Sequence, residues 1–142
     1  MVIDFFIYLF DGGDIMIFDE ITKFVKGEMY TKVLTASNSA LTTEWTIIKK
    51  FTVPYKEGYV GVIHSINADE SVDAELDILV EESTIGEKYG SPFRTKALVD
   101  PVYLNVVVEK GDVEFRARMR SGTGTLGYFV ATVILVKKEA IK

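Results

Sequence analysis

The sequence contains no cysteine, a single histidine (His64) and only three prolines among 142 residues. Without cysteine the chain cannot form disulfides, thiolate zinc sites or iron–sulfur clusters, and it has no cysteine nucleophile. One histidine cannot supply a two-histidine metal site, and a serine triad around it would need a nucleophile elbow that the sequence does not contain. We therefore expect no resident metal or cofactor and no enzymatic activity.

The sequence also lacks a long hydrophobic run. Its apolar N-terminal stretch, residues 1–10, is interrupted by Asp4 and followed by a polar turn at residues 11–14. A bilayer-spanning helix needs about 20 apolar residues, and a secretory signal needs a basic start and a small-residue cleavage site. We expect neither a membrane span nor a secretory signal, and both a virion and a cytoplasmic location fit these features.

Residues that favour β-structure are abundant. The chain has 17 valines, 13 isoleucines and 12 threonines against 8 alanines, a bias towards β-sheet. Its hydrophobic share of 48% and charged share of 26% are those of a globular protein, and its length is that of one domain. We expect residues 1–142 to form a single all-β domain, with residues 1–28 as a candidate N-terminal arm or hairpin.

Hydrophobic alternation with a period of two predicts the strands. It is clearest in residues 72–80 and 113–120, where every second residue is apolar and most of the others are charged. Further strands are expected at residues 29–36, 43–53, 59–68, 102–109 and 128–136. The last of these is apolar on both faces, so it should be central in a sheet or covered by a neighbouring subunit.

The connections between these strands suggest their pairing. Residues 45–81 are expected to form a three-stranded meander, and the short turn Lys110–Asp112 is expected to close a hairpin between residues 102–109 and 113–120. Residues 82–101 lack periodicity but contain aromatic residues, which indicates a packed loop. Ile21, Phe24 and Val25 suggest one short helix near the N-terminus.

About eight such strands in a chain of this length predict a two-sheet antiparallel sandwich, most plausibly a jelly roll. Between about Met29 and Lys137 the sequence predicts a series of short strands, a long loop late in the chain and a final strand that is apolar on both faces. This pattern resembles that of jelly-roll subunits of viral coats and of the tumour-necrosis-factor type. This resemblance implies a building block that associates with copies of itself.

Charge is distributed unevenly along the chain. Residues 57–87 hold nine carboxylates and no lysine or arginine, whereas residues 88–142 hold ten basic and five acidic residues. The net charge of -5 and the isoelectric point near 4.9 do not suit contacts with phosphates. We expect no nucleic-acid partner.

Two rows of opposite charge are candidate interface residues. The basic row is Arg116, Arg118 and Arg120, and the acidic row is Asp73, Glu75 and Asp77. If their strands are neighbours, the rows pair within the chain, each pair contributing about 0.2–1 kcal/mol. Otherwise the rows are outward faces that pair between subunits, or the arginines bind sulfated or phosphorylated groups.

Three other motifs favour structural roles. The string Gly122–Gly127 matches G-x-G-x-x-G, but a strand follows it instead of a helix, so we expect a hairpin loop rather than a dinucleotide site. His64 is expected on the same apolar face of its strand as Val60, Val62 and Ile66, either in the core or against a second subunit. Residues 67–70 do not match a calcium-binding loop and are expected to form a solvated turn.

The sequence thus favours a non-enzymatic structural or attachment module that forms a homo-oligomer, such as a trimer or a larger ring, in a virion coat, decoration or surface assembly. The alternative is a carbohydrate-binding module with an aromatic stacking platform. Its candidate aromatics are Tyr55, Tyr59, Tyr89, Phe93 and Tyr103. In the long loop, Tyr89, Phe93 and Arg94 are the candidate ligand-binding residues.

Overall fold

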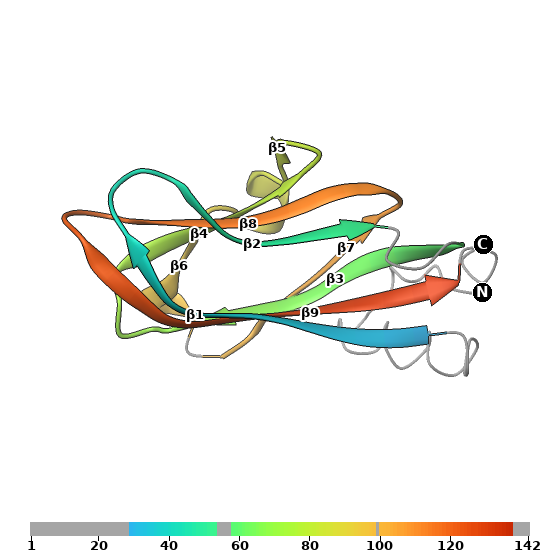
Figure 1. The fold of residues 1–142 in the computed structure, drawn as a ribbon, viewed down its shortest axis with the longest axis horizontal. Helices are drawn as coiled ribbons and strands as arrows, with labels where there is room; N and C mark the ends of the chain where they lie inside the picture. Colours follow the sequence, from blue (N-terminus) through green and yellow to red (C-terminus); the bar gives the residue numbers. More distant parts are fainter. Residues whose placement is uncertain (1–28, 54–57, 99, 138–142) are drawn as a thin grey trace.

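The computed structural model describes residues 29–53, 58–98 and 100–137, which form nine β-strands and two short 3-10 helices (Figure 1). The long strands are β1 (Met29–Leu41), β2 (Thr46–Val53), β3 (Tyr59–Ala68), β4 (Ala74–Val80), β7 (Val102–Val108), β8 (Gly111–Met119) and β9 (Gly124–Lys137). The short elements are β5 (Ser83–Thr84), η1 (Glu87–Tyr89), β6 (Phe93–Arg94) and η2 (Thr95–Ala97). The expected N-terminal arm and short helix lie outside the described residues.

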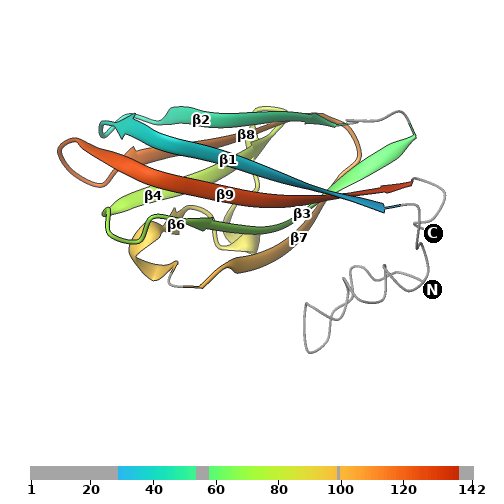
Figure 2. The same cartoon turned by 60° about the horizontal axis from the view of Figure 1, so that its bottom comes forward.

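The strands form two antiparallel sheets packed face to face, which confirms the predicted all-β sandwich (Figures 1 and 2). The first sheet has the order β1-β9-β3-β7, and the second has the order β2-β8-β4, with β5 and β6 both paired to β4. Successive long strands alternate between the two sheets, so that sequence neighbours face one another across the core. This interleaved order is that of a jelly roll.

Two predicted pairings are wrong. Strand β7 belongs to the first sheet and β8 to the second, so Lys110–Asp112 does not close a hairpin. Likewise, β2, β3 and β4 do not form a meander, because β3 lies in the first sheet between its neighbours β9 and β7. Gly111, with φ of 118°, lets the chain turn sharply from one layer to the other. A short glycine-containing turn serves a crossing between sheets as well as a hairpin.

Two β-bulges also change which residues face the core. The register of β2 against β8 shifts between Ile47 and Lys49, and that of β3 against both neighbours shifts between Ile63 and Ser65. Because a bulge inserts one residue, it moves the following side chains to the opposite face. Val60 and Val62 therefore face outward while Ile66 lies in the core, and the expected single face around His64 is not formed.

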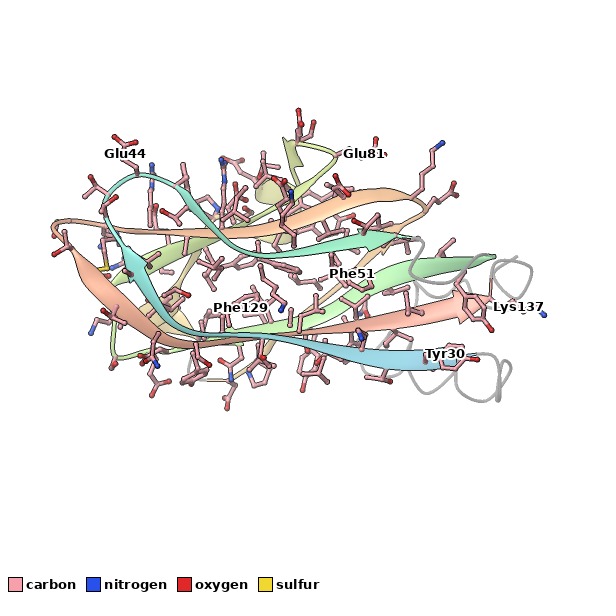
Figure 3. All side chains as sticks on the ribbon, viewed as in Figure 1. Tyr30, Glu44, Phe51, Glu81, Phe129 and Lys137 are labelled. Carbon is pink, nitrogen blue, oxygen red and sulfur yellow. The ribbon has the colours of Figure 1, made fainter. Side chains whose placement is uncertain are left out.

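The core lies between the sheets. The side chains of Phe51 on β2 and Phe129 on β9 point into the space between the layers from opposite sheets (Figure 3). Phe129 also contacts Phe115 of β8, with ring centroids 5.1 Å apart. Strand β9 is central, as predicted from its two apolar faces, and its inward residues belong to this core.

The described part of the stretch 82–101, which excludes residue 99, is packed as predicted, and its short strands pair with β4 of the second sheet. Thr95 is fully buried there: its hydroxyl accepts a hydrogen bond from the Ala74 amide at 3.0 Å and donates one to the Val72 carbonyl. Phe93 and Leu98 are buried in the core beside it. These contacts fix the loop across the start of β4.

Candidate functional site

The outer face of the second sheet brings the two charged rows together. Strands β4 and β8 are neighbours, and their register places Asp77 opposite Arg116 and Glu75 opposite Arg118. Arg118 Nε donates to Glu75 Oε1 at 3.0 Å. The rows therefore pair within one chain, the first of the three alternatives considered for them.

Asp77 is the centre of this face, with 4% of its surface exposed. Its Oδ2 accepts hydrogen bonds from Arg116 Nη2 at 2.8 Å and Nε at 3.2 Å. Its Oδ1 accepts from Thr84 Oγ1 at 2.7 Å, from the Ile78 amide at 2.9 Å and from Ser91 Oγ. Burial alone would raise the pKa of this carboxyl, but the bonds from Ser91, Thr84 and Arg116 outweigh burial and lower the pKa below its ordinary value of 3.8.

The pairs become weaker and more exposed towards the edge of this face. Arg120 lies 3.6 Å from Asp73 and 3.9 Å from Glu75, and Arg94 of β6 lies 3.7 Å from Asp73. All three distances join guanidinium nitrogens to carboxylate oxygens, and about half of the Arg94 side chain is exposed. Pairs of this kind contribute about 0–1 kcal/mol each.

One aromatic ring completes the charged face. The guanidinium carbons of Arg116 and Arg118 lie 4.5 and 4.3 Å from the ring centroid of Trp45, within the range of cation–π contacts. Both arginines are thus held by a carboxylate and by the same indole ring. Arg116 donates through Nε and Nη2, and Arg118 through Nε, to carboxylates of the same chain, which makes both less suited to capture a free anion.

The candidate ligand-binding residues of the long loop do not form a stacking platform. Phe93 lies in the core, and Tyr89 at the end of η1 packs against the core. Arg94 projects from β6 towards Asp73. Among the other proposed aromatics, Tyr59 packs against the core, Tyr103 is 43% exposed on the opposite sheet, and Tyr55 lies outside the described residues.

The turn at residues 67–70 is held by hydrogen bonds of Asp69. Its Oδ1 accepts from the Ser71 amide at 3.0 Å and from Ser71 Oγ at 2.6 Å, and its Oδ2 accepts from the Gly127 amide at 3.0 Å. The bonds from Ser71 and Gly127 lower the pKa of Asp69 despite some desolvation. Among the described residues no group of three or more histidine, aspartate and glutamate side chains is placed to hold a metal ion.

The glycine motif connects the two sheets. Residues 120–123 join β8 in the second sheet to β9 in the first, and Gly124–Gly127 are already part of β9. The predicted hairpin loop is therefore wrong, since the strands on either side do not pair with each other. Gly127 is placed against Asp69, where an added Cβ would lie 2.6 Å from the Asp69 Oδ2 atom.

Two shallow hollows are present on the described surface. One, of about 310 Å³, is lined by Glu81, Glu82, Gly111 and Asp112. The other, of about 360 Å³, lies where β1 ends and β9 begins, and it is lined by Ala40–Thr42 and Thr123–Thr125. The described lining of neither hollow combines a nucleophile with a base and a group that orients it.

The outer face of the first sheet has the opposite character. The register of β1, β9, β3 and β7 aligns Val33, Thr132, Ser65 and Tyr103 in one row across all four strands, on the face away from the core. None of the outward-facing residues of these four strands is Asp, Glu, Lys or Arg. We call this surface the uncharged face.

Exposed apolar side chains are concentrated on the uncharged face. Six large hydrophobic residues are strongly exposed in the described structure, and four of them lie here: Val33 (56%), Tyr128 (44%), Tyr103 (43%) and Val107 (43%). Towards the Lys137 end of the sheet, the outward-facing Val60, Val62, Ile134 and Val136 are buried. The half of the uncharged face that carries Val33, Tyr103 and Tyr128 is the exposed half.

This face was missed by reasoning from charge rows. Its signal in the sequence is the length of chain without charge: residues 121–136 contain no charged residue, and residues 29–43 contain only Lys32. Those two segments form β1 and β9, which pair along their whole length.

No protein-family model matches the chain, and a search of curated proteins found no significant relative. No helix in the described ranges is long and apolar enough to cross a membrane.

Proposed function

We propose that this protein is a non-enzymatic structural or attachment module that associates with copies of itself, such as a subunit of a virion coat, a decoration or a surface assembly. The observation that carries the proposal is the division of the surface between the two sheets. One outer face pairs its charges internally, and the other exposes valine and tyrosine without a single charged residue.

Exposure of apolar side chains to water is unfavourable, and covering a surface that has no charged group requires no desolvation of a charge. Charged residues are depleted and tyrosine is enriched in the centres of protein–protein interfaces. Contiguous exposed apolar patches on soluble proteins commonly mark interaction sites. The uncharged face has no charged residue and exposes Val33, Tyr103, Val107 and Tyr128, which supports association through a surface rather than recognition in a pocket.

The arrangement of ionisable groups supports the absence of enzymatic activity. Asp77, the most buried carboxylate among the described residues, has its pKa lowered and accepts hydrogen bonds at both oxygens, so it is a poor general base or acid near neutral pH. Its partner Arg116 is bound to it and stacked on Trp45. These groups serve stability.

Carbohydrate binding is the second candidate, and one observation favours it. Tyr103 and Tyr128 are exposed on the same open sheet face, where aromatic rings can stack on sugar rings. The two residues lie on β7 and β9, with β3 between them, and Phe93 and Tyr89 do not join them. A single broad platform is therefore not assembled, which makes self-association the better supported function.

The proposal is tested by measuring the mass of the native protein with multi-angle light scattering during size-exclusion chromatography, across a hundredfold range of concentration. Self-association predicts a mass that is a multiple of the 15.9 kDa chain. A mass of one chain at every concentration would contradict it. Retention on immobilised glycans by such a monomer would favour the carbohydrate-binding alternative.

A further inference from the structure

We infer that the exposed half of the uncharged face is an isologous contact surface, and that its occupant is the same face of a second copy of this chain. This inference rests on the proposed function and deepens it by naming the surface and the symmetry. In an isologous pair the two copies are related by a two-fold axis, so the same patch is used on both sides.

The charge pattern favours a second copy as the occupant. In an isologous contact, a charge near the two-fold axis meets its own like charge, and such juxtaposition costs several kcal/mol. The row Val33, Thr132, Ser65 and Tyr103 crosses the sheet without any charge, so two copies can meet there without repulsion. A partner of strong positive or negative charge would find no complementary group on this face.

The chemistry of the row also suits contact with itself. Valine and tyrosine supply apolar area, while the hydroxyls of Thr132, Ser65 and Tyr103 can each donate and accept hydrogen bonds. Groups that both donate and accept are self-complementary, because each can pair with its symmetry mate in either sense. The hydroxyl groups of this row can therefore form hydrogen bonds with the same row of a second copy.

The available area suits a weak, concentration-dependent contact. The exposed half lies over residues 32–37 of β1, 128–133 of β9 and 65–68 of β3, and only Val102 and Tyr103 of β7 extend into it. Three to four strands about 4.8 Å apart and about five residues with a rise of about 3.3 Å define a patch of roughly 17 by 17 Å. Side chains corrugate such a patch, so two copies would bury on the order of 900 Å² in total, which is the size of a transient interface.

The test introduces a charge into the face and compares it with a matched charge elsewhere. Val33→Lys places a lysine on β1, an edge strand of the first sheet, at a residue that is 56% exposed. Ile47→Lys places a lysine on β2, an edge strand of the second sheet, at a residue that is 49% exposed. Both variants are measured by sedimentation equilibrium, with circular dichroism to verify that each is folded.

The inference predicts that Val33→Lys raises the dissociation constant of the assembly at least about tenfold, whereas Ile47→Lys changes it less than about threefold. An assembled wild-type protein that responds equally to both substitutions, or only to Ile47→Lys, would overturn the inference while leaving the proposed function intact. A wild-type protein that is monomeric throughout would overturn both. If that monomer is destabilised by Val33→Lys and not by Ile47→Lys, the occupant of the face is a segment of the same chain.

Discussion

Removing the charge of Asp77 should destabilise the fold far more than removing that of Glu75, although both carboxylates pair with an arginine on β8. Asp77 is 4% exposed and accepts hydrogen bonds from Arg116, Thr84, Ser91 and the backbone. In Asp77→Asn the remaining oxygen can still accept from Thr84 and Ser91, but the new amide group donates towards the guanidinium of Arg116. The variant therefore leaves a half-buried arginine without its counter-charge.

The expected cost follows from burial. Removing one partner of a fully buried ion pair costs about 3–5 kcal/mol, and a hydrogen bond to a charged group is worth about 1.5–3 kcal/mol. Because the Arg116 side chain is 27% exposed and keeps some contact with water, we expect Asp77→Asn to lower the free energy of unfolding by about 2–3 kcal/mol. Glu75→Gln, whose partner Arg118 is 39% exposed, should cost about 0.5–1 kcal/mol.

The same carboxyl should contribute to acid sensitivity. The pKa of Asp77 is lowered in the folded protein from its ordinary value of 3.8. A group with a depressed folded-state pKa stabilises the fold above its unfolded-state pKa, and this contribution is lost as the pH falls through the folded-state value. The difference in stability between the wild type and Asp77→Asn should thus be constant at neutral pH and shrink as the pH falls below 3.8.

Unfolding in guanidinium chloride measures these differences. Trp45 is the only tryptophan and contacts Arg116 and Arg118, so its fluorescence reports on the charged face. Far-UV circular dichroism reports on the sheets as a whole, and the two transitions should coincide. A cost for Asp77→Asn below about 1 kcal/mol, or equal to that of Glu75→Gln, would refute the reasoning, since a buried pair should not behave as an exposed one.

Two further substitutions test how the loops are held. Thr95→Val should cost about 2 kcal/mol in chemical denaturation, because the Ala74 amide and the Val72 carbonyl each lose a hydrogen bond to the buried hydroxyl; Thr95→Ser keeps the hydroxyl and should cost about half as much. Gly127→Ala should cost about 1–2 kcal/mol, because its Cβ would displace the Asp69 carboxylate that accepts the Gly127 amide. Equal costs for Thr95→Val and Thr95→Ser, or a Gly127→Ala variant as stable as the wild type, would contradict these roles.

The positions of the strands could be predicted from the sequence because each long strand has one solvent-exposed face and one buried face, or two buried faces. Strands β4 and β8 match the two clearest alternating segments, and β3 lies at the residues predicted for it. The pairing of the charged rows followed as one of three alternatives, since complementary rows on neighbouring strands stabilise each other. These features depend on local periodicity, which a single sequence records well.

Pairing between strands could not be predicted in the same way. The turn at Gly111 has the chemistry of a hairpin, yet it joins two sheets, because local turn residues specify a change of direction and not which strand lies alongside. The bulges near Ile47 and His64 cannot be recognised from the alternation of apolar and polar residues in the sequence. Each moves the residues beyond it to the other face, which is why Ile47 is exposed and Ile66 is buried.

The candidate interface could be anticipated only in part. The charged rows were expected to pair within the chain or to form an interface, and Arg116 and Asp77 pair within the chain. The surface that we propose for a partner is the uncharged face, which is formed when the register aligns Val33, Thr132 and Tyr103 across separate strands. Its signal in the sequence is the low number of charged residues in β1 and β9.

Cross-linking at Thr132 tests the central claim most directly. Thr132 lies on the central strand β9 within the uncharged row, and the chain has no cysteine, so Thr132→Cys and the control Ile47→Cys each carry one thiol. Facing sheets pack about 10 Å apart, so a thiol cross-linker of about that length should convert Thr132→Cys to covalent dimers and leave Ile47→Cys as single chains. Covalent dimers from Ile47→Cys alone, or equal yields from both variants, would contradict association through the uncharged face.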